Sequence, residues 1–349
     1  MKYSFIIPVY NRPGEVAELL ESLQQQRLKD FEVIVVEDGS QIPCKDVCDQ
    51  FAGILALRYY SKPNSGPGQS RNYGVERARG EWVIILDSDV VLPSDYLGAV
   101  DKALAAQGEP SGAREDGAPV DAFGGPDASH PSFTPVQKAI SYSMTSFFTT
   151  GGIRGGKKKL DRFYPRSYNM GIRRQVYNQL GGFSRMRFGE DIDFSYRIVE
   201  SGHRTALFSD AWVWHKRRTD LRKFYRQVYN SGIARINLEK RHPGTMKIVH
   251  MLPMLFTVGV FALLLLALAS VLLGYYCWGA AALCPLLFYA LLICCDSARQ
   301  NRSLRVGLLS VPAAFVQLMG YGLGFIEAWW KRCVNGQDEF AAFEKNFYK

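Results

Sequence analysis

The chain carries no charged side chain between His250 and Asp296. Two apolar runs fill this stretch, residues 251–276 and 277–295. The first is longer than the roughly 20 residues that a helix needs to cross a bilayer. A buried helix of a soluble protein is rarely so long and so uniformly apolar. We therefore predict two transmembrane helices joined by a very tight turn.

A third apolar run, residues 306–330, contains Gln317, several glycines and Glu327. This run either spans the membrane or lies in its interface. The aromatic pair Trp329-Trp330 suits an interfacial position. Two spans with an interfacial helix and three full spans both remain open at this point.

Basic residues precede the first apolar run, and by the positive-inside rule they place the preceding part of the chain in the cytoplasm. They are Arg217, Arg218, Arg222, Lys223, Arg226, Arg235, Lys240, Arg241 and Lys247. The arginines at 299, 302 and 305 would return to the same side, which fits two spans. A third span would place Lys331 and Arg332 outside, against the rule.

The net charge of +9 beside apolar runs indicates a membrane surface rather than nucleic acid, since no paired Cys/His finger and no aromatic RNA-binding strand occurs. The seven cysteines include no C-x-x-C pair, so we expect reduced thiols facing the cytosol. The N-terminal "YSFIIPVY" is too short for a signal peptide. The soluble part is therefore expected to stay in the cytoplasm.

The first half of the chain alternates apolar runs with segments of helical spacing. The runs are "KYSFIIPVY", "FEVIVVEDGS", "ILALRYY" and "EWVIILDSDVVL", and the helical segments are "GEVAELLESLQQQ" and "GPGQSRNYGVERARG". Unbroken apolar strands alternating with helices indicate a parallel sheet covered on both faces. We predict an α/β fold with a mostly parallel sheet sandwiched by helices.

Polar clusters follow three of these runs at the point where each strand should end: Tyr10-Asn11, Glu37-Asp38 and Asp87-Ser88-Asp89. Ligands of such sheets bind at the carboxyl ends of the strands, so we expect the clusters to share one crevice. Two carboxylates separated by one residue can hold a hard divalent cation, which prefers oxygen ligands. Alone, the same pattern is more often a polar turn that ends a strand, because short acidic motifs are common.

Four segments in this order resemble family 2 glycosyltransferases of the GT-A (nucleotide-diphospho-sugar transferase) fold. They are "IIPVYNRP", "VIVVEDGS", "NSGPGQSRNYGVERARGEWVIILDSD" and "GGFSRMRFGEDIDFSYRI". The resemblance covers residues 1–240. It implies a GT-A domain over 1–240. Together with the apolar runs and the basic residues, this gives the expected organisation: a cytoplasmic GT-A domain over 1–240, a membrane region over 241–330 with two or three transmembrane or interfacial helices, and a short tail over 331–349.

The resemblance also implies roles for individual residues. Nucleotide-sugar contacts would come from Pro8, Tyr10, Glu37, Asp38, Arg71 and Asp87. The metal ligands would be Asp89, Asp87 and His215, holding Mg²⁺ or Mn²⁺. The catalytic pair would be Glu190 and Asp191, with Asp191 as the base because Asp193 falls on another face of the helix.

Simpler interpretations of these residues stay open. Asp38 would suit a turn, Arg71 a helix surface, and His215 the surface of a basic segment. The acids at 190 and 191 would also suit the positive end of a helix dipole.

The acceptor side is expected between residues 108 and 174. By resemblance, Asn169, Met170 and Gly171 form a strand beneath the transferred sugar. The segment "GEPSGAREDGAP" is a linker or loop, and "FTTGGIRGGKKKLDRF" is either a lid that closes over phosphates or a solvated loop.

The resulting hypothesis is a membrane-anchored, metal-dependent, inverting glycosyltransferase at the inner (plasma) membrane. A UDP-sugar is the expected donor, a lipid-linked saccharide or lipid the expected acceptor, and surface polysaccharide or lipopolysaccharide assembly the expected role. Membrane lipids are expected partners and nucleic acid is not. The Gln-x-x-Arg-Trp motif of processive synthases is absent, since the comparable region reads "RKFYRQVYNSG".

Three alternatives remain in view. One is a polyprenyl-phosphate sugar transferase, and another is a catalytically degenerate nucleotide-sugar-binding membrane protein. The third, a nucleotidyltransferase, is disfavoured because "PVYNRPGE" lacks the glycine- and arginine-rich loop that such enzymes carry after the first strand.

Overall fold

The computed structural model describes residues 1–106, 119–130, 132–150, 163–216 and 218–339. These residues divide into two compact units. The first, here the sheet unit, holds the described residues up to 130 together with 163–216. The second, here the helical unit, holds residues 132–150 and 218–339.

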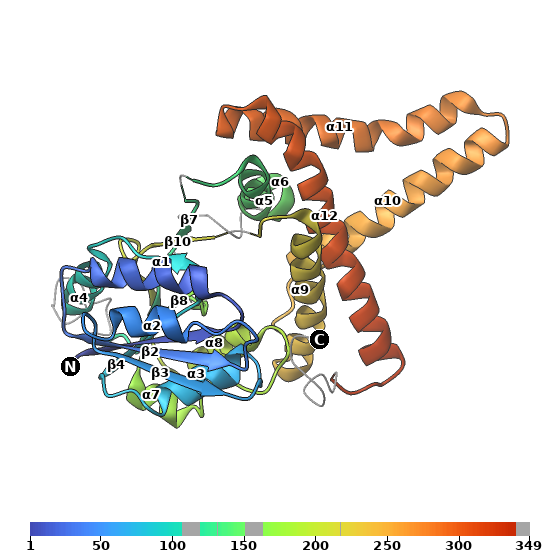
Figure 1. The fold of residues 1–349 in the computed structure, drawn as a ribbon. Coiled ribbons are helices and arrows are strands. Elements are labelled where there is room, and N and C mark those ends of the chain that lie inside the picture. Colours follow the sequence, from blue (N-terminus) through green and yellow to red (C-terminus); the bar gives the residue numbers. More distant parts are fainter. Residues whose placement is uncertain (107–118, 131, 151–162, 217, 340–349) are drawn as a thin grey trace. The chain divides into compact units, whose positions relative to one another are not determined.

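A seven-stranded sheet forms the centre of the sheet unit (Figure 1). Its strands, in the order in which they lie side by side, are β3 (Leu57–Lys62), β2 (Phe31–Asp38), β1 (Tyr3–Val9), β4 (Trp82–Leu86), β8 (Asn169–Arg173), β6 (Ala122–Gly124) and β9 (Thr205–Leu207). The first four are parallel, β8 is antiparallel to both of its neighbours, and β9 is parallel to β6. The predicted mostly parallel sheet is confirmed.

Helices cover both faces of this sheet because successive apolar residues of a strand point to opposite sides. Phe5 and Ile7 of β1 pack with α1 (Pro13–Gln24), whereas Ile6 packs on the other face. The first face also carries α2 (Lys45–Phe51) and α4 (Tyr96–Ala106), and the second carries α3 (Pro67–Val75), α7 (Arg174–Gln179) and α8 (Glu190–Glu200). The two helices predicted from spacing correspond to α1 and α3.

A second, three-stranded sheet in the same unit was not predicted. It consists of β5 (Val90–Val91), β10 (Val213–His215) and β7 (Asp127–Ala128), with β10 in the middle. Strands of two or three residues leave too short a pattern to be found in a sequence. This sheet nevertheless positions the site described below.

The helical unit contains α5 (Pro135–Thr145), α6 (Phe147–Thr150), α9 (Leu221–Arg241), α10 (Ile248–Leu272), α11 (Tyr276–Asn301) and α12 (Leu304–Trp329), followed by a π-helical turn, Trp330–Val334. Three helices are long and apolar enough to cross a membrane: Ile248–Leu272, Tyr276–Asn301 and Leu304–Val334. The two predicted runs are therefore helical, and the third run meets the same criterion of length and composition.

Close packing joins α9 to α12 through glycines. A Cβ added at Gly232 of α9 would lie 2.1 Å from the carbonyl oxygen of Tyr321, and one at Gly324 of α12 would lie 2.1 Å from the carbonyl oxygen of Tyr229. Residues of α5, α9 and α12 also share one apolar cluster. Helices α5, α6 and α9 thus pack with the apolar helices in this unit, and the domain boundary at residue 240 stays a prediction.

Candidate functional site

The carboxyl ends of β1 and β2 are tied together by Asn11. Its backbone has a positive φ of 54°, a conformation that asparagine adopts more readily than most residues. Its side-chain oxygen accepts hydrogen bonds from the backbone N–H groups of Gln41 (2.8 Å) and Ile42 (3.0 Å). The loops after the two strands are therefore held side by side, as expected for a shared crevice.

Asp87, Asp89 and His215 form a cluster next to these loops. Each offers one ligand atom, and the three atoms lie within 4.8 Å of one another. The Nε2 of His215 is 3.3 Å from Oδ1 of Asp89. Two carboxylates and one imidazole within this distance fit a divalent cation. The three residues predicted as metal ligands are thus brought together.

The small sheet explains how His215 reaches the aspartates. Antiparallel pairing places His215 of β10 opposite Val90 of β5, directly after Asp89. On the other side of β10, the carboxylate of Asp127 lies 3.7 Å from Nδ1 of His215. The ring of Tyr168 stacks on the imidazole at a centroid distance of 5.1 Å. A carboxylate behind a histidine is the usual arrangement around a metal-binding imidazole.

Arg12 also contacts the cluster, and sequence reasoning missed it. Its Nη1 donates to Oδ2 of Asp89 at 2.8 Å. Burial alone would lower the pKa of Arg12, but the nearby carboxylates of Asp89, Glu15 and Asp87 together outweigh it and the pKa is raised. The one available signal was position, since Arg12 follows the end of β1 directly.

Arg71 of α3 connects the aspartate pair to the start of α8. Its Nη2 donates to Asp87 (2.8 Å) and its Nη1 to Glu190 (2.9 Å). Ser167 accepts a further hydrogen bond from Nη2 at 3.1 Å. The Arg71 side chain is only 4% exposed, so the interpretation as a surface arginine is wrong. Burial raises the pKa of Glu190, although Arg71 opposes this.

Asp191 has a different arginine partner. The Nε of Arg166 donates to Oδ2 of Asp191 at 2.7 Å, and the backbone N–H of Ile192 donates to Oδ1 at 2.9 Å. Burial alone would raise the pKa of Asp191, but Arg166 outweighs it and the pKa is lowered. Asp191 is therefore ionised at neutral pH, as a proton acceptor must be.

Asp193 is occupied elsewhere on α8. Its Oδ2 accepts hydrogen bonds from Ser184 (2.7 Å) and from Nε of Arg197 (3.1 Å). Its side chain is buried. These contacts agree with the choice of Asp191 over Asp193 as the candidate base.

The acids at the end of β2 are held by protein groups. Asp38 accepts hydrogen bonds from the backbone N–H groups of Ser65 (2.9 Å) and Gly66 (2.8 Å), and it pairs with Lys62. Glu37 accepts from the backbone N–H of Cys44 at 2.7 Å. Both side chains are buried, and Asp38 organises the turn before α3.

Pro8 is buried in β1, and Tyr10 is half-buried at its end. The contacts predicted between a nucleotide and Pro8, Tyr10, Glu37 and Asp38 stay predictions.

The predicted acceptor strand is a strand, but it lies inside the sheet. Met170 is fully buried in the core, and a Cβ at Gly171 would lie 2.0 Å from the ring of Phe123. The side-chain oxygen of Asn169 accepts from the hydroxyl of Tyr96 at 2.6 Å. These residues therefore support the sheet, and their predicted place beneath the transferred sugar stays a prediction.

Two other predicted features lie outside the described residues. They are the loop at 108–119, described only at its last residue, and most of the glycine- and lysine-rich segment up to residue 162.

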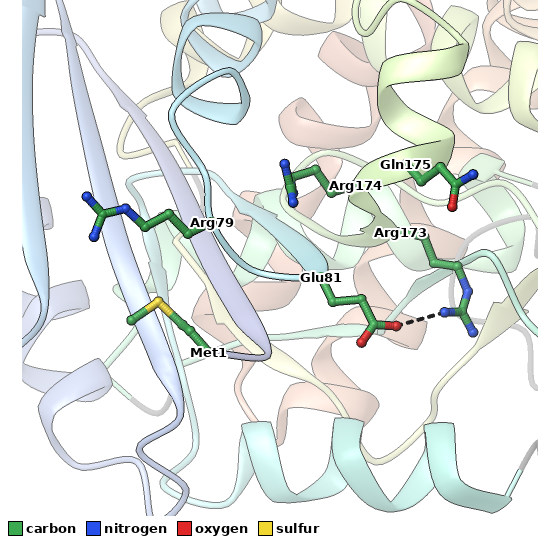
Figure 2. A pocket seen from close by; sticks show the side chains of 6 residues that line it. All are labelled: Met1, Arg79, Glu81, Arg173, Arg174 and Gln175. Carbon is green, nitrogen blue, oxygen red and sulfur yellow. Dashed lines mark hydrogen bonds and ion pairs between the residues drawn. The ribbon is translucent and has the colours of Figure 1, made fainter.

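A hollow of about 370 Å³ lies away from this site (Figure 2). It is lined by Met1, Arg79, Glu81, Arg173, Arg174 and Gln175. Met1 and Glu81 precede the parallel strands β1 and β4, so the hollow lies at the amino ends of these strands, whereas the aspartate cluster lies at their carboxyl ends. It takes no part in the site.

Comparison with known families matches the chain to "Glycosyl transferase family 2" over residues 4–180, half of its length. A second family description, "Glycosyl transferase family group 2", matches residues 162–293. Together the two matches include every residue of the site described above.

Curated relatives match over shorter segments. An uncharacterized glycosyltransferase of Haemophilus influenzae is 41% identical over 86 residues, which are 25% of this chain and 29% of the relative. The poly(ribitol-phosphate) beta-N-acetylglucosaminyltransferase TarS of Staphylococcus aureus is 39% identical over 101 residues, 28% of this chain and 18% of TarS. The matched segment thus spans less than a third of the length of these relatives.

Among solved structures, the mannosyltransferase PcManGT from Pyrobaculum calidifontis, in complex with GDP-Man and Mn²⁺, has a similar fold. The TM-score is 0.57 at 18% identity, and the similarity covers 95% of this chain and 88% of that one. With the family match over half of its residues and the sheet, helices and apolar C-terminal helices described above, this chain belongs to glycosyl transferase family 2 and has the GT-A fold.

Proposed function

We propose that this glycosyltransferase is membrane-anchored, metal-dependent and inverting, and that it moves a sugar from a nucleotide-sugar to a lipid-linked saccharide or lipid. The observation that best supports this proposal is that ligand atoms of Asp87, Asp89 and His215 lie within 4.8 Å of one another, next to the carboxyl ends of the strands. Arg71 bridges this cluster to Glu190, so the start of α8 adjoins it. A metal-binding set beside an ionised carboxylate is what this type of sugar transfer needs.

Asp191 is the proposed base. It takes the proton from the acceptor hydroxyl while that oxygen forms a bond to the anomeric carbon of the donor sugar. The bond from the same carbon to the diphosphate oxygen breaks, and the electron pair leaves with the nucleoside diphosphate. One base and one displacement give inversion at the sugar carbon. The lowered pKa of Asp191 supports this role, because the carboxylate is ready to accept a proton at neutral pH.

Asp89, Asp87 and His215 are the proposed ligands of Mg²⁺ or Mn²⁺. Such a cation would neutralise the diphosphate of the departing nucleotide. The carboxylate of Asp127 lies 3.7 Å from Nδ1 on the other side of the His215 ring, and the Tyr168 ring stacks on the imidazole. Arg12 contacts Oδ2 of Asp89, and His215 lies 3.3 Å from Oδ1 of the same carboxylate.

The proposed donor is a UDP-sugar, and TarS, a relative by sequence, is named for transfer of N-acetylglucosamine. GDP-sugars are the second group to test, since PcManGT was solved with GDP-Man and Mn²⁺. The three apolar helices support an acceptor held in the membrane, at the cytoplasmic face of the inner membrane. Assembly of a surface polysaccharide or lipopolysaccharide would use such a transfer.

The test is donor turnover by the full chain purified in detergent. A panel of UDP-, GDP-, CMP- and dTDP-sugars is supplied with Mn²⁺ or Mg²⁺, with and without membrane lipid extract, and released nucleotide is measured. We expect turnover of one donor class that needs the cation and is lost in Asp89→Ala. Asp46→Asn, an exposed aspartate on α2, is the control and should behave as the unchanged protein. No turnover of any donor with either ion and lipid extract would refute the proposal.

A further inference from the structure

We propose that Arg166 is the anion receptor of the acceptor site. It would bind an oxyanion, a phosphate or a carboxylate, that lies beside the reacting hydroxyl of the acceptor, and this binding would release Asp191 to act as the base. The inference rests on the proposed function, because it assigns the chemical class of the acceptor for the same site.

The first support is the way in which Arg166 covers the candidate base. The Arg166 side chain is 37% exposed, whereas that of Asp191 is 14% exposed. Arg166 is therefore the more accessible member of the pair. Both oxygens of Asp191 already accept hydrogen bonds, one from Arg166 and one from the backbone of Ile192. A hydroxyl can donate a strong hydrogen bond to Asp191 only if the hydrogen bond from Arg166 is weakened or broken.

The second support is the unused donor capacity of Arg166. A guanidinium carries five N–H donors in a planar fork. Arg166 contacts Asp191 through Nε, and among the described residues neither of its terminal nitrogens makes a hydrogen bond. Two adjacent Nη groups match the two oxygens of a phosphate or carboxylate. The arrangement therefore leaves an anion-binding edge that points away from the base.

A purely structural role for this side chain is already filled by other contacts. The hydroxyl of Ser195 on α8 donates to the carbonyl oxygen of Pro165, and Arg71 donates to Ser167 at 3.1 Å. The backbone N–H of Asn169 donates to the carbonyl oxygen of Arg166 at 3.0 Å. The main chain is thus anchored on both sides of Arg166, and the side chain is not needed to hold this segment against α8.

Distance restricts where the anion lies on the acceptor. The guanidinium touches Asp191 at 2.7 Å, so an oxyanion on its outer edge lies within a few bonds of a hydroxyl that faces Asp191. The inferred acceptor therefore carries its negative charge close to the hydroxyl that receives the sugar. A phosphate separated from the reacting sugar by a long saccharide would not reach Arg166.

The experiment measures donor hydrolysis with water as the acceptor, in the full chain in detergent. Phenyl phosphate, benzoate and the neutral benzyl alcohol are the probes. An anion that draws Arg166 away from Asp191 should raise the hydrolysis rate about tenfold, the effect of one charge-assisted hydrogen bond. Phenyl phosphate should do this and benzyl alcohol should not. Benzoate distinguishes the two kinds of anion. Stimulation by both phenyl phosphate and benzoate indicates a site that binds any oxyanion, and stimulation by phenyl phosphate alone indicates a site for phosphate.

Variants separate release of the base from other effects. Arg166→Gln should hydrolyse the donor faster than the unchanged protein without any probe and should no longer respond to phenyl phosphate. A merely structural arginine would give the opposite, a slower enzyme. Arg166→Lys, which keeps the charge, should retain part of the response. Arg79→Gln removes an exposed arginine at the opposite edge of the sheet and should respond as the unchanged protein does (Figure 2).

A second measurement does not depend on turnover. The protein is saturated with UDP, and the phosphorus NMR line width of phenyl phosphate is recorded. The unchanged protein and Arg79→Gln should broaden the line, and Arg166→Gln should not. Equal broadening by Arg166→Gln, or inhibition of hydrolysis by phenyl phosphate, would overturn the inference. If no donor turns over but this difference in broadening is seen, the proposed function fails and the anion site stands.

Discussion

Replacing Arg71 should destabilise the sheet unit in a pH-dependent way. Arg71→Met removes the guanidinium but keeps an unbranched side chain near the Phe183 ring, which lies 5.1 Å from the Arg71 guanidinium carbon. Asp87 is 30% exposed and can be solvated after the change, but Glu190 is only 12% exposed. The variant thus leaves one buried carboxylate without its cation, and such a group is costly.

The size of the effect follows from protonation. Burial raises the pKa of Glu190, and Arg71 opposes this, so loss of Arg71 raises the pKa further. Once that pKa exceeds the pH, folding requires protonation of a group whose unfolded pKa is about 4.3. This costs about 1.4 kcal/mol for each pH unit above the unfolded pKa. Because the pKa of Glu190 is already raised in the unchanged protein, the added loss of unfolding free energy is at most about 4.4 kcal/mol at pH 7.5 and at most about 1.6 kcal/mol at pH 5.5.

Hydrogen exchange measured by mass spectrometry against urea is the appropriate assay, because peptides from β1 and β4 report on the sheet unit alone. The double variant Arg71→Met with Glu190→Gln is the control. It lacks the buried acid at position 190, so its loss should be smaller and equal at both pH values. The reasoning is refuted if the single variant loses as much at pH 5.5 as at pH 7.5, or if the double variant is no more stable than the single one.

Two further predictions concern the base and the helix packing. Burial would raise the pKa of Asp191, but Arg166 holds it low, so donor hydrolysis without an anionic acceptor, in which Arg166 stays paired with Asp191, should stay constant from pH 8 to about 5 and fall only as pH approaches the lowered pKa. A pH–rate profile of this hydrolysis that declines already near pH 6 would contradict this. Gly232→Ala places a Cβ 2.1 Å from the carbonyl oxygen of Tyr321. This overpacking should lower the unfolding free energy by about 1–3 kcal/mol, measured by hydrogen exchange in α9. Gly259→Ala is the control and should cost far less, because the space around its Cβ is open.

The parallel half of the sheet could be predicted because its signal is local. Each of β1, β2 and β4 is an unbroken apolar run that ends in polar residues. The long apolar helices are equally plain in composition. What such patterns do not contain is pairing between short strands. The antiparallel strand β8 and the three-residue strands β6, β9 and β10 depend on contacts that the sequence does not display.

The cationic partners of the site could not be predicted for a related reason. Arg71 and Glu190 are 119 residues apart, and Arg12 and Asp89 are 77 residues apart. The family resemblance identified the carboxylates, but it did not identify the arginine that pairs with each of them. Arg166 had no signal at all beyond its place before the strand β8, and Asp127 lay in a segment without a recognisable pattern.

Three arginines form hydrogen bonds with the site's carboxylates, and they differ in how easily each can change its partner. Arg71 is 4% exposed and is held by Asp87, Glu190 and Ser167. Arg12 and Arg166 are 32% and 37% exposed, and each donates one side-chain hydrogen bond to an acid within the described residues.

Breaking one hydrogen bond at an exposed side chain costs far less than uncovering a buried pair. Arg71 is therefore the fixed element that joins α3, α8 and the end of β4. Arg12 and Arg166, each with one hydrogen bond to an acid, are the two cations that can change partners at lower cost.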